Sequence, residues 1–289
     1  MSLVALLLVG AVLGTVIGML GGGGGVLAVP MLVALGEPVL SASTMSLVVV
    51  GTGAAAALVP HQRAGRVDWR IGTVFGALGS VGAVVGARLS GVVPPDALLL
   101  GFAVLVLLGA GTMLRAGRTA RRLQELQREA GLLEPRGADA ELLAQHRAVA
   151  GLADPVETPV EPPVVSQALR IGPRVVVLAT GVGLVTGLFG VGAGFVVVPA
   201  LVAALHVPVK RATATALVVI VINSAVALVA KHDHLTDLPS AVELAAITAA
   251  FAVVGAVLSR RVPAWVLSSA FGSLLVLVAV YTLARALTL

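Results

Sequence analysis

The sequence predicts an all-α polytopic membrane protein made of two inverted-topology repeats, each with a Gly-rich broken helix or re-entrant hairpin and three transmembrane helices. Three observations predict this class. Hydrophobic residues make up 58% of the 289-residue chain and charged residues only 11%, where a soluble chain carries about 25% charged residues. Apolar runs of about 20 residues, the length that crosses a bilayer, recur along most of the sequence. The chain also repeats itself.

An ungapped internal alignment reveals the duplication. Residues 14–34, GTVIGMLGGGGGVLAVPMLVA, align with residues 183–203, GLVTGLFGVGAGFVVVPALVA, and are identical at 11 of 21 positions. The shared positions include a ladder of glycines and the pair Pro30 and Pro199, at an offset of 169 residues. Apolar sequence of low complexity produces chance matches, but a ladder and a proline in one register indicate a repeated unit.

The duplication continues downstream. The same offset pairs Asp68 with Asp237, and one extra residue aligns PVLSASTMSLVV (38–49) with PVKRATATALVV (208–219). A polar, proline-containing stretch between the copies is typical of a linker, and its first part is compatible with a surface helix. The predicted domains are a first membrane repeat (1–115), a polar linker (116–169) and a second membrane repeat (170–289).

Each half contains five apolar segments. They cover about residues 2–20, 25–36, 40–60, 71–90 and 97–114, then 173–190, 194–206, 211–230, 239–259 and 264–285. The second segment of each half, at about 1.5 Å per residue, is too short to cross a hydrocarbon core of about 30 Å. The first two segments are therefore predicted to enter the membrane and return, as a re-entrant hairpin or as a full span followed by a short one.

Basic residues predict the orientation of each half, because lysine and arginine favour cytoplasmic loops. In the first half, arginines join the third and fourth segments and follow the fifth. In the second half, basic residues precede the third segment and join the fourth and fifth. The halves are thus predicted to be inserted in opposite senses. The linker is expected to be cytoplasmic, and the loop 231–237 and both termini to be outside.

Glycines break the first apolar stretch of each half at Gly21 to Gly25 and at Gly190, Gly192 and Gly194. Irregular backbone at membrane depth is tolerated only where protein or a water-filled cavity covers it. The short helices that follow have free N–H groups and a partial positive charge, which suit an anion near the midplane. The predicted substrate-binding residues are Gly21, Gly22, Gly23, Gly24, Gly25, Ser43, Thr44, Ser46, Gly190, Gly192, Gly194, Thr213, Thr215 and Asn223.

Glycines and hydroxyl residues of this kind can also serve only to pack and stabilise helices, and the sequence does not decide between this role and substrate binding. Glycines spaced four apart are typical of close helix packing in membranes. Serine and threonine in membrane helices often bond to their own backbone. The glycines with the spacing expected for packing are Gly10, Gly14, Gly18, Gly183 and Gly187.

The charged residues near the membrane segments favour structural roles. Asp68 and Asp237 precede the fourth segment of each half and are expected to cap it rather than to couple protons. Arg88 and Glu243 lie inside that segment, about a turn or more from its boundary. The long side chain of Arg88 is expected to reach the interface. No cysteine is present and the histidines have no metal-like spacing, so we predict neither a metal, a cofactor nor an enzyme.

The duplicated pattern GxxxGxxGxGxGxxxxPxL, the Ala/Ser/Thr-rich stretch after it and GRVDW (65–69) resemble the TauE/SafE family of sulfite exporters, also called the toluene sulfonate uptake permease family. The resemblance covers both halves but not the linker. It implies a carrier of small sulfur-containing anions in the bacterial inner membrane. The expected partners are a small anionic substrate and the lipid bilayer, without nucleic acid, and the oligomeric state is open. An anion channel and a non-transporting membrane assembly or sensor protein remain as alternatives.

Overall fold

The computed structural model describes residues 3–21, 23–133, 172–191, 194–205, 209–234 and 237–259, with Val207 and scattered positions between 262 and 283. These residues form helices and no strand. The first half contains α1 (Leu3–Leu20), the 3₁₀ helix η1 (Gly23–Leu27), α2 (Ala28–Ala34), α3 (Val39–Arg63), α4 (Trp69–Ser90) and α5 (Pro95–Leu133). The second half contains α7 (Pro173–Phe189), α8 (Gly194–Leu205), α9 (Val209–Ala230), the 3₁₀ helix η2 (His232–His234) and α10 (Leu238–Leu258).

The helices follow the predicted apolar segments, and the all-helical fold class is confirmed for the described residues. Within that part of the chain, four helices are long and apolar enough to cross a membrane: α3, α4, α9 and α10. One helix differs from the prediction. α5 continues past residue 115 without a break, so the polar residues up to Leu133 extend this helix instead of starting a new one. The predicted segment 264–285 lies largely outside the described residues.

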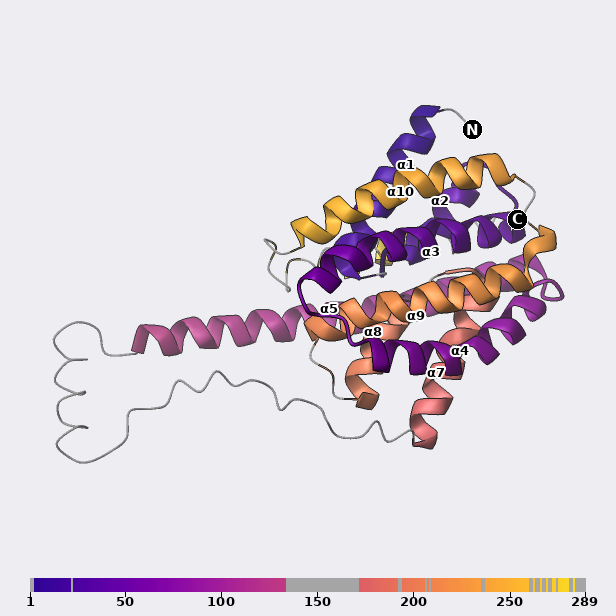
Figure 1. The fold of residues 1–289 in the computed structure, drawn as a ribbon. Helices are drawn as coiled ribbons and strands as arrows, with labels where there is room; N and C mark the ends of the chain where they lie inside the picture. Colours follow the sequence, from indigo (N-terminus) through magenta and orange to yellow (C-terminus); the bar gives the residue numbers. More distant parts are fainter. Residues whose placement is uncertain are drawn as a thin grey trace, which may run out of the picture.

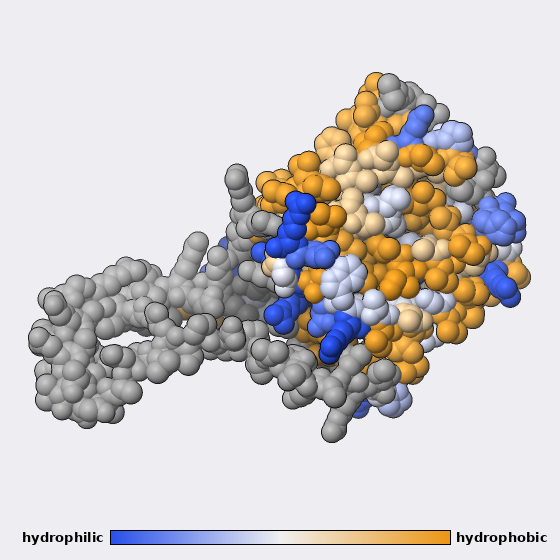
Figure 2. All heavy atoms as spheres, in the orientation of Figure 1, coloured by the Kyte–Doolittle hydropathy of each residue, from blue (hydrophilic) through white to orange (hydrophobic). Residues whose placement is uncertain are grey.

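The outer faces of the helices are apolar. Leu8 on α1, Val81 on α4 and Val254 on α10 are 64%, 65% and 56% exposed. Figure 2 shows apolar residues across most of one face of the molecule, with polar residues gathered toward its edges. Large apolar side chains that face outward are what a hydrocarbon environment requires, so these faces suit contact with lipid, as expected for a multi-pass membrane protein.

Neighbouring helices contact one another in the order α1, α10, α3, α9, α4, α7, and Figure 1 shows α3 and α9 near the centre of the molecule. Under the internal alignment, α1 corresponds to α7, α10 to α4 and α3 to α9. The order of contacts is therefore the same from either end. Each half thus packs its first helix on the fourth segment of the other half.

Glycines make these contacts close. A Cβ on Gly14 of α1 would overlap the Thr248 carbonyl of α10, and a Cβ on Gly183 of α7 would overlap the Gly79 carbonyl of α4. Gly14 aligns with Gly183 and Gly79 aligns with Thr248, so this is one contact made twice. The packing role predicted for the glycines spaced four apart is confirmed, because added Cβ atoms would also overlap neighbours at Gly10, Gly18 and Gly187.

The predicted aspartate caps are present in both halves. An Asp68 carboxylate oxygen accepts a hydrogen bond from the Ile71 backbone N–H at 3.0 Å, at the start of α4. Asp237 does the same for the Ser240 backbone N–H at 3.1 Å, at the start of α10. Hydrogen bonds from the Ser240 side chain and backbone lower the pKa of Asp237. The two aspartates therefore begin equivalent helices, as the alignment predicts.

Candidate functional site

Both halves break their first helix at a glycine with a left-handed backbone. α1 ends at Leu20, and Gly21 follows with φ of 64°. α7 ends at Phe189, and Gly190 follows with φ of 67°. Glycine adopts this conformation at little cost, whereas a side chain would strain it. Because Gly21 and Gly190 are aligned positions, the two breaks are the same feature in two copies.

Beyond Gly21 the chain lies back against α1. The η1 glycines are buried, and a Cβ on Gly24 would lie 2.6 Å from the backbone nitrogen of Ile17. The glycine run therefore permits two backbone segments to touch, which any side chain would prevent. In the second half, Gly194 is buried and begins α8. The predicted site residues Gly22 and Gly192 lie outside the described residues.

Each break lies against the third segment of the other half. A Cβ on Gly21 would overlap the backbone and methyl group of Thr213 on α9, and a Cβ on Gly190 would overlap the backbone and hydroxyl of Ser43 on α3. Ser43 and Thr213 are aligned positions at the offset of 170 residues that relates 38–49 to 208–219. The structure thus brings four predicted site residues together as two reciprocal contacts.

Polar side chains gather at the Gly190 break. The Ser46 hydroxyl donates a hydrogen bond to the Ser43 carbonyl at 2.9 Å and also contacts the Gly190 carbonyl. The Lys231 ammonium donates to the Ser43 hydroxyl at 2.8 Å and to the Leu188 carbonyl at 3.4 Å. Ser43, Ser46 and Lys231 are all buried. A buried cation therefore lies beside two predicted site residues.

Lys231 is the site residue that the sequence analysis missed, because it was assigned to an external loop. It directly follows Ala230, where the candidate membrane span ends, and its side chain is only 1% exposed. Burial lowers the pKa of Lys231 from its ordinary value of 10.5 to about 7. The available signal was its position directly after a long apolar run, because ionisable residues at membrane segments are candidate functional residues.

Two of the predicted hydroxyls have partners away from the breaks. Thr44 donates to the Leu40 carbonyl of its own helix at 3.0 Å. The Thr215 hydroxyl accepts a hydrogen bond from the Asp68 backbone N–H at 3.1 Å, which ties α9 to the start of α4. These contacts match the structural interpretation of membrane serines and threonines.

Asn223 lies in the middle of α9 and packs on a glycine. Its side chain is 1% exposed, and a Cβ on Gly79 of α4 would lie 2.8 Å from its amide nitrogen. Among the described residues, neither side-chain polar atom of Asn223 has a hydrogen-bond partner. The aligned position on α3 is Gly53, which packs on Thr248 of α10, and the buried Thr248 hydroxyl also lacks a partner in the described part of the chain. The centre of the molecule therefore holds unpaired polar atoms.

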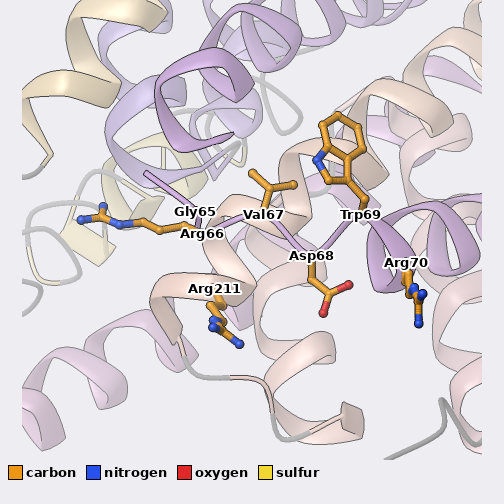
Figure 3. A pocket seen from close by; sticks show the side chains of 7 residues that line it. All are labelled: Gly65, Arg66, Val67, Asp68, Trp69, Arg70 and Arg211. Atoms are coloured by element: carbon orange, nitrogen blue, oxygen red, sulfur yellow. The ribbon is translucent and has the colours of Figure 1, made fainter. Parts of the chain in front are cut away.

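A separate basic pocket of about 220 Å³ lies at the start of α4. Figure 3 shows Arg70 and Arg211 on either side of the Asp68 side chain, with Arg66 extended away from it. The pocket belongs to the loop predicted to be cytoplasmic. An excess of positive charge around a hollow raises the local concentration of anions. Its lining residues are Gly65, Arg66, Val67, Asp68, Trp69, Arg70 and Arg211.

The sequence model of the family described as "Sulfite exporter TauE/SafE" matches residues 6–282 of the chain. The chain belongs to this family. The TauE/SafE resemblance that the glycine blocks indicated is thus confirmed over nearly the whole sequence.

Curated relatives of this TauE/SafE protein bear transporter names. A "Probable membrane transporter protein" of Xylella fastidiosa (strain 9a5c) is 28% identical over 291 residues, which cover 98% of this chain and 96% of that protein. The "Probable membrane transporter protein YunE" of Bacillus subtilis (strain 168) is 27% identical over 234 residues, which cover 78% of this chain and 76% of that protein. No solved structure matches the chain. The family and these names, with the four apolar helices, indicate a multi-pass membrane transporter.

Proposed function

We propose that this TauE/SafE protein is a secondary transporter that moves small sulfur-containing anions, of the sulfite, thiosulfate or organosulfonate class, across the bacterial inner membrane. The reciprocal contact of each glycine break with the other half is the observation that carries this proposal. The description of the family supports the substrate class.

The exchanged contacts support two inverted repeats. α1 packs on α10 as α7 packs on α4, and Gly21 meets Thr213 as Gly190 meets Ser43. The basic loops predict opposite orientations for the two halves. Many secondary transporters have such repeats, with the substrate near the midplane where broken helices meet. In our proposal the linker is cytoplasmic and both termini are outside.

The two breaks lie near opposite ends of α9. Thr213, which contacts Gly21, lies in the first turns of that helix, and Lys231, which lies at the Gly190 break, follows its last residue. These positions are 18 residues apart in the sequence, which corresponds to about 27 Å along a helix at about 1.5 Å per residue. The breaks are therefore suited to open in turn, one toward each side of the membrane.

In this proposal the anion passes between the breaks along the middle of α9. The Asn223 amide lies there and has no partner among the described residues. A buried polar group without a partner costs about 1–3 kcal/mol, so a ligand that pairs with it gains part of that free energy. The first backbone N–H groups of α8 and of the η1–α2 helix are further donors, since a helix start has no internal acceptor for them.

Counterflow of labelled sulfite into proteoliposomes tests the proposal. The vesicles are loaded in turn with thiosulfate, taurine, sulfoacetate, sulfate or chloride. We expect saturable exchange with at least one sulfur anion and none with chloride. Conductance without counterflow would instead indicate an anion channel. Folded protein that exchanges none of these anions would overturn the substrate class.

A further inference from the structure

Lys231 is a buried cation without a counter-charge in the described part of the chain. Within that part, no carboxylate lies within ion-pair distance of its ammonium nitrogen, and the neighbouring Asp233 is paired with His232 at 3.0 Å. Removing an ammonium group from water without a charged partner is costly. Such an arrangement favours the binding of an anion from outside the chain.

Among the described residues, the ammonium group of Lys231 has one more donor than it has acceptors. It carries three N–H bonds, and its acceptors in that part of the chain are the Ser43 hydroxyl at 2.8 Å and the Leu188 carbonyl at 3.4 Å. Ser43 is itself only 4% exposed. An anion that approaches this group therefore meets a free N–H bond and, next to it, the Ser43 hydroxyl.

A small cavity adjoins Ser43. Its volume is about 10 Å³, which is the space of about one water molecule. Apolar side chains of α2, α3, α5 and α7 form the rest of its wall, so an anion here is screened from water. Since the cavity is smaller than a sulfur oxyanion, the surrounding helices must separate to admit one. The lining residues are Val29, Val39, Ser43, Leu98, Leu99, Phe102, Leu188 and Phe189.

We propose that Lys231 and Ser43 form an oxyanion-binding site at the Gly190 break, in which the lysine ammonium supplies the counter-charge for the transported anion. This inference rests on the proposed transport function and assigns a charged binding residue to it. A lysine ammonium is a compact point charge, so the site selects small anions with an accessible oxygen over neutral solutes. When the Gly190 break opens, the anion occupies this site. It does so either before or after it passes the middle of α9, depending on the direction of transport.

The first half has a basic residue at the equivalent place. At the 170-residue offset, LVPH (58–61) aligns with LVAK (228–231), so His61 corresponds to Lys231. His61 is also buried, with 5% of its surface exposed. Both halves therefore end their third segment with a buried basic side chain, although the adjoining loops differ. A basic group at this place in both repeats fits a binding role better than a chance loop lysine does.

The alternative is that Lys231 only holds α3 and α7 together through its two hydrogen bonds. Two readouts separate these roles. If the lysine awaits an anion, Lys231→Met removes an unpaired buried charge, so the anion-free protein melts at the same temperature or higher. If the lysine is structural, the same change lowers the melting temperature and leaves anion affinity unchanged.

The test uses the purified full chain in lipid nanodiscs, titrated with thiosulfate, sulfoacetate or chloride by calorimetry. We expect Lys231→Met and Lys231→Gln to weaken thiosulfate binding at least ~30-fold, the low end for loss of one partner of a buried charge pair. Lys231→Arg keeps the charge and should stay within about tenfold of the natural chain. The matched control is Arg121→Gln, which removes an exposed cation from the ion pair with Glu125 and should change nothing.

The outcomes separate the two proposals. A neutral Lys231 variant that binds thiosulfate as tightly as the natural chain overturns the assignment of Lys231 and leaves transport standing. A natural chain that binds none of the anions and shows no counterflow overturns the transport proposal, and this inference with it. If both neutral variants fail to fold, Ser43→Ala decides, because it leaves the lysine in place. We expect it to bind about threefold to tenfold more weakly, and unchanged affinity would overturn the site.

Discussion

The two glycine breaks have the same backbone but different side chains around them. Gly21 lies against Thr213 and Gly190 lies against Ser43, with nearly equal φ angles and aligned partners. Both breaks are buried in the contact between the halves. The two halves thus share a left-handed backbone at the break and a close contact with the other half. Glycine permits both at these positions.

The polar groups at the two breaks have diverged. The Gly190 break has the Ser46 hydroxyl and the Lys231 ammonium, whereas the aligned residues of the other half are Ala216 and His61. A lysine ammonium carries three N–H donors, whereas an imidazole has two ring nitrogens in a fixed plane. We therefore expect the two ends of the pathway to hold an anion with different affinity, which would make an otherwise symmetric carrier asymmetric in its kinetics.

The largest effect is expected at the breaks themselves. Gly21→Leu and Gly190→Leu should each abolish sulfite counterflow, because the new side chain collides with the backbone of the other half and strains a left-handed residue. The measurement is counterflow per amount of folded protein, with folding checked by gel filtration and circular dichroism.

Gly36→Leu is the control for these variants. Gly36 has a φ of 95° but no atom within 4 Å of an added Cβ, so this variant also places a side chain on a left-handed residue but without a collision. We expect it to retain most of its transport. If Gly36→Leu loses transport as fully as Gly190→Leu does, strain rather than contact between the halves governs the breaks.

The second prediction concerns the pH dependence of anion binding at Lys231. The pKa of Lys231 is lowered to about 7, so its ammonium is charged below that pH and neutral above it. Affinity for thiosulfate, which keeps its charge across this range, should fall as pH rises through about 7, by at most about tenfold per pH unit. Titration of the natural chain between pH 6 and pH 9, at about one-unit steps, measures this.

Other titratable groups on the surrounding elements need to be separated from this effect. His232 and Asp233 follow Lys231, Glu37 precedes α3 and His61 lies near its far end, and Asp96 lies in the first turn of α5. Lys231→Arg is the control, because arginine stays charged throughout the range. Its affinity should be nearly independent of pH, and an unchanged slope in this variant would assign the titration to another group.

The sequence predicted the fold well where local pattern determines it. Apolar segments fall within a few residues of α3, α4, α9 and α10, and glycines spaced four apart mark the helix contacts. The extent of α5 was missed because an apolar window ends where polar residues begin. Leucine, arginine, glutamate and glutamine after residue 115 are good helix formers, so the helix continues after its apolar face has ended.

The candidate site was predicted only in part, for a different reason. Gly190, Ser43 and Ser46 were named and lie together, whereas Thr44 and Thr215 were named on the same grounds and bond elsewhere. The spacing of residues along one helix does not reveal which hydroxyl contacts the glycine break of the other half. The identification of Lys231 depends even more on tertiary structure. Only the packing of α3 and α7 beside it shows that its side chain is buried.

The third prediction compares the two unpaired polar groups at the centre. Thr248→Val removes a buried hydroxyl without a described partner, so we expect a slightly higher melting temperature and normal transport. Asn223→Leu should also raise the melting temperature but should weaken thiosulfate affinity, by about threefold to tenfold. Thermal melting and calorimetry on the same preparations measure both effects. Equal thiosulfate affinity in the two variants would remove Asn223 from the pathway and leave the breaks as its binding sites.

The smallest effect is expected at the start of α4. Asp68→Ala removes the acceptor of the Ile71 N–H and should cost about 1 kcal/mol of stability, as loss of a helix cap does. Asp68→Asn should restore most of it, since asparagine caps nearly as well. Asp68 also lines the basic pocket. The thiosulfate affinity of the two variants therefore decides whether Asp68 is only a helix cap or also affects anion binding. Unchanged affinity in both variants leaves Asp68 a cap, whereas tighter binding in both would show that its negative charge opposes anion binding near this pocket.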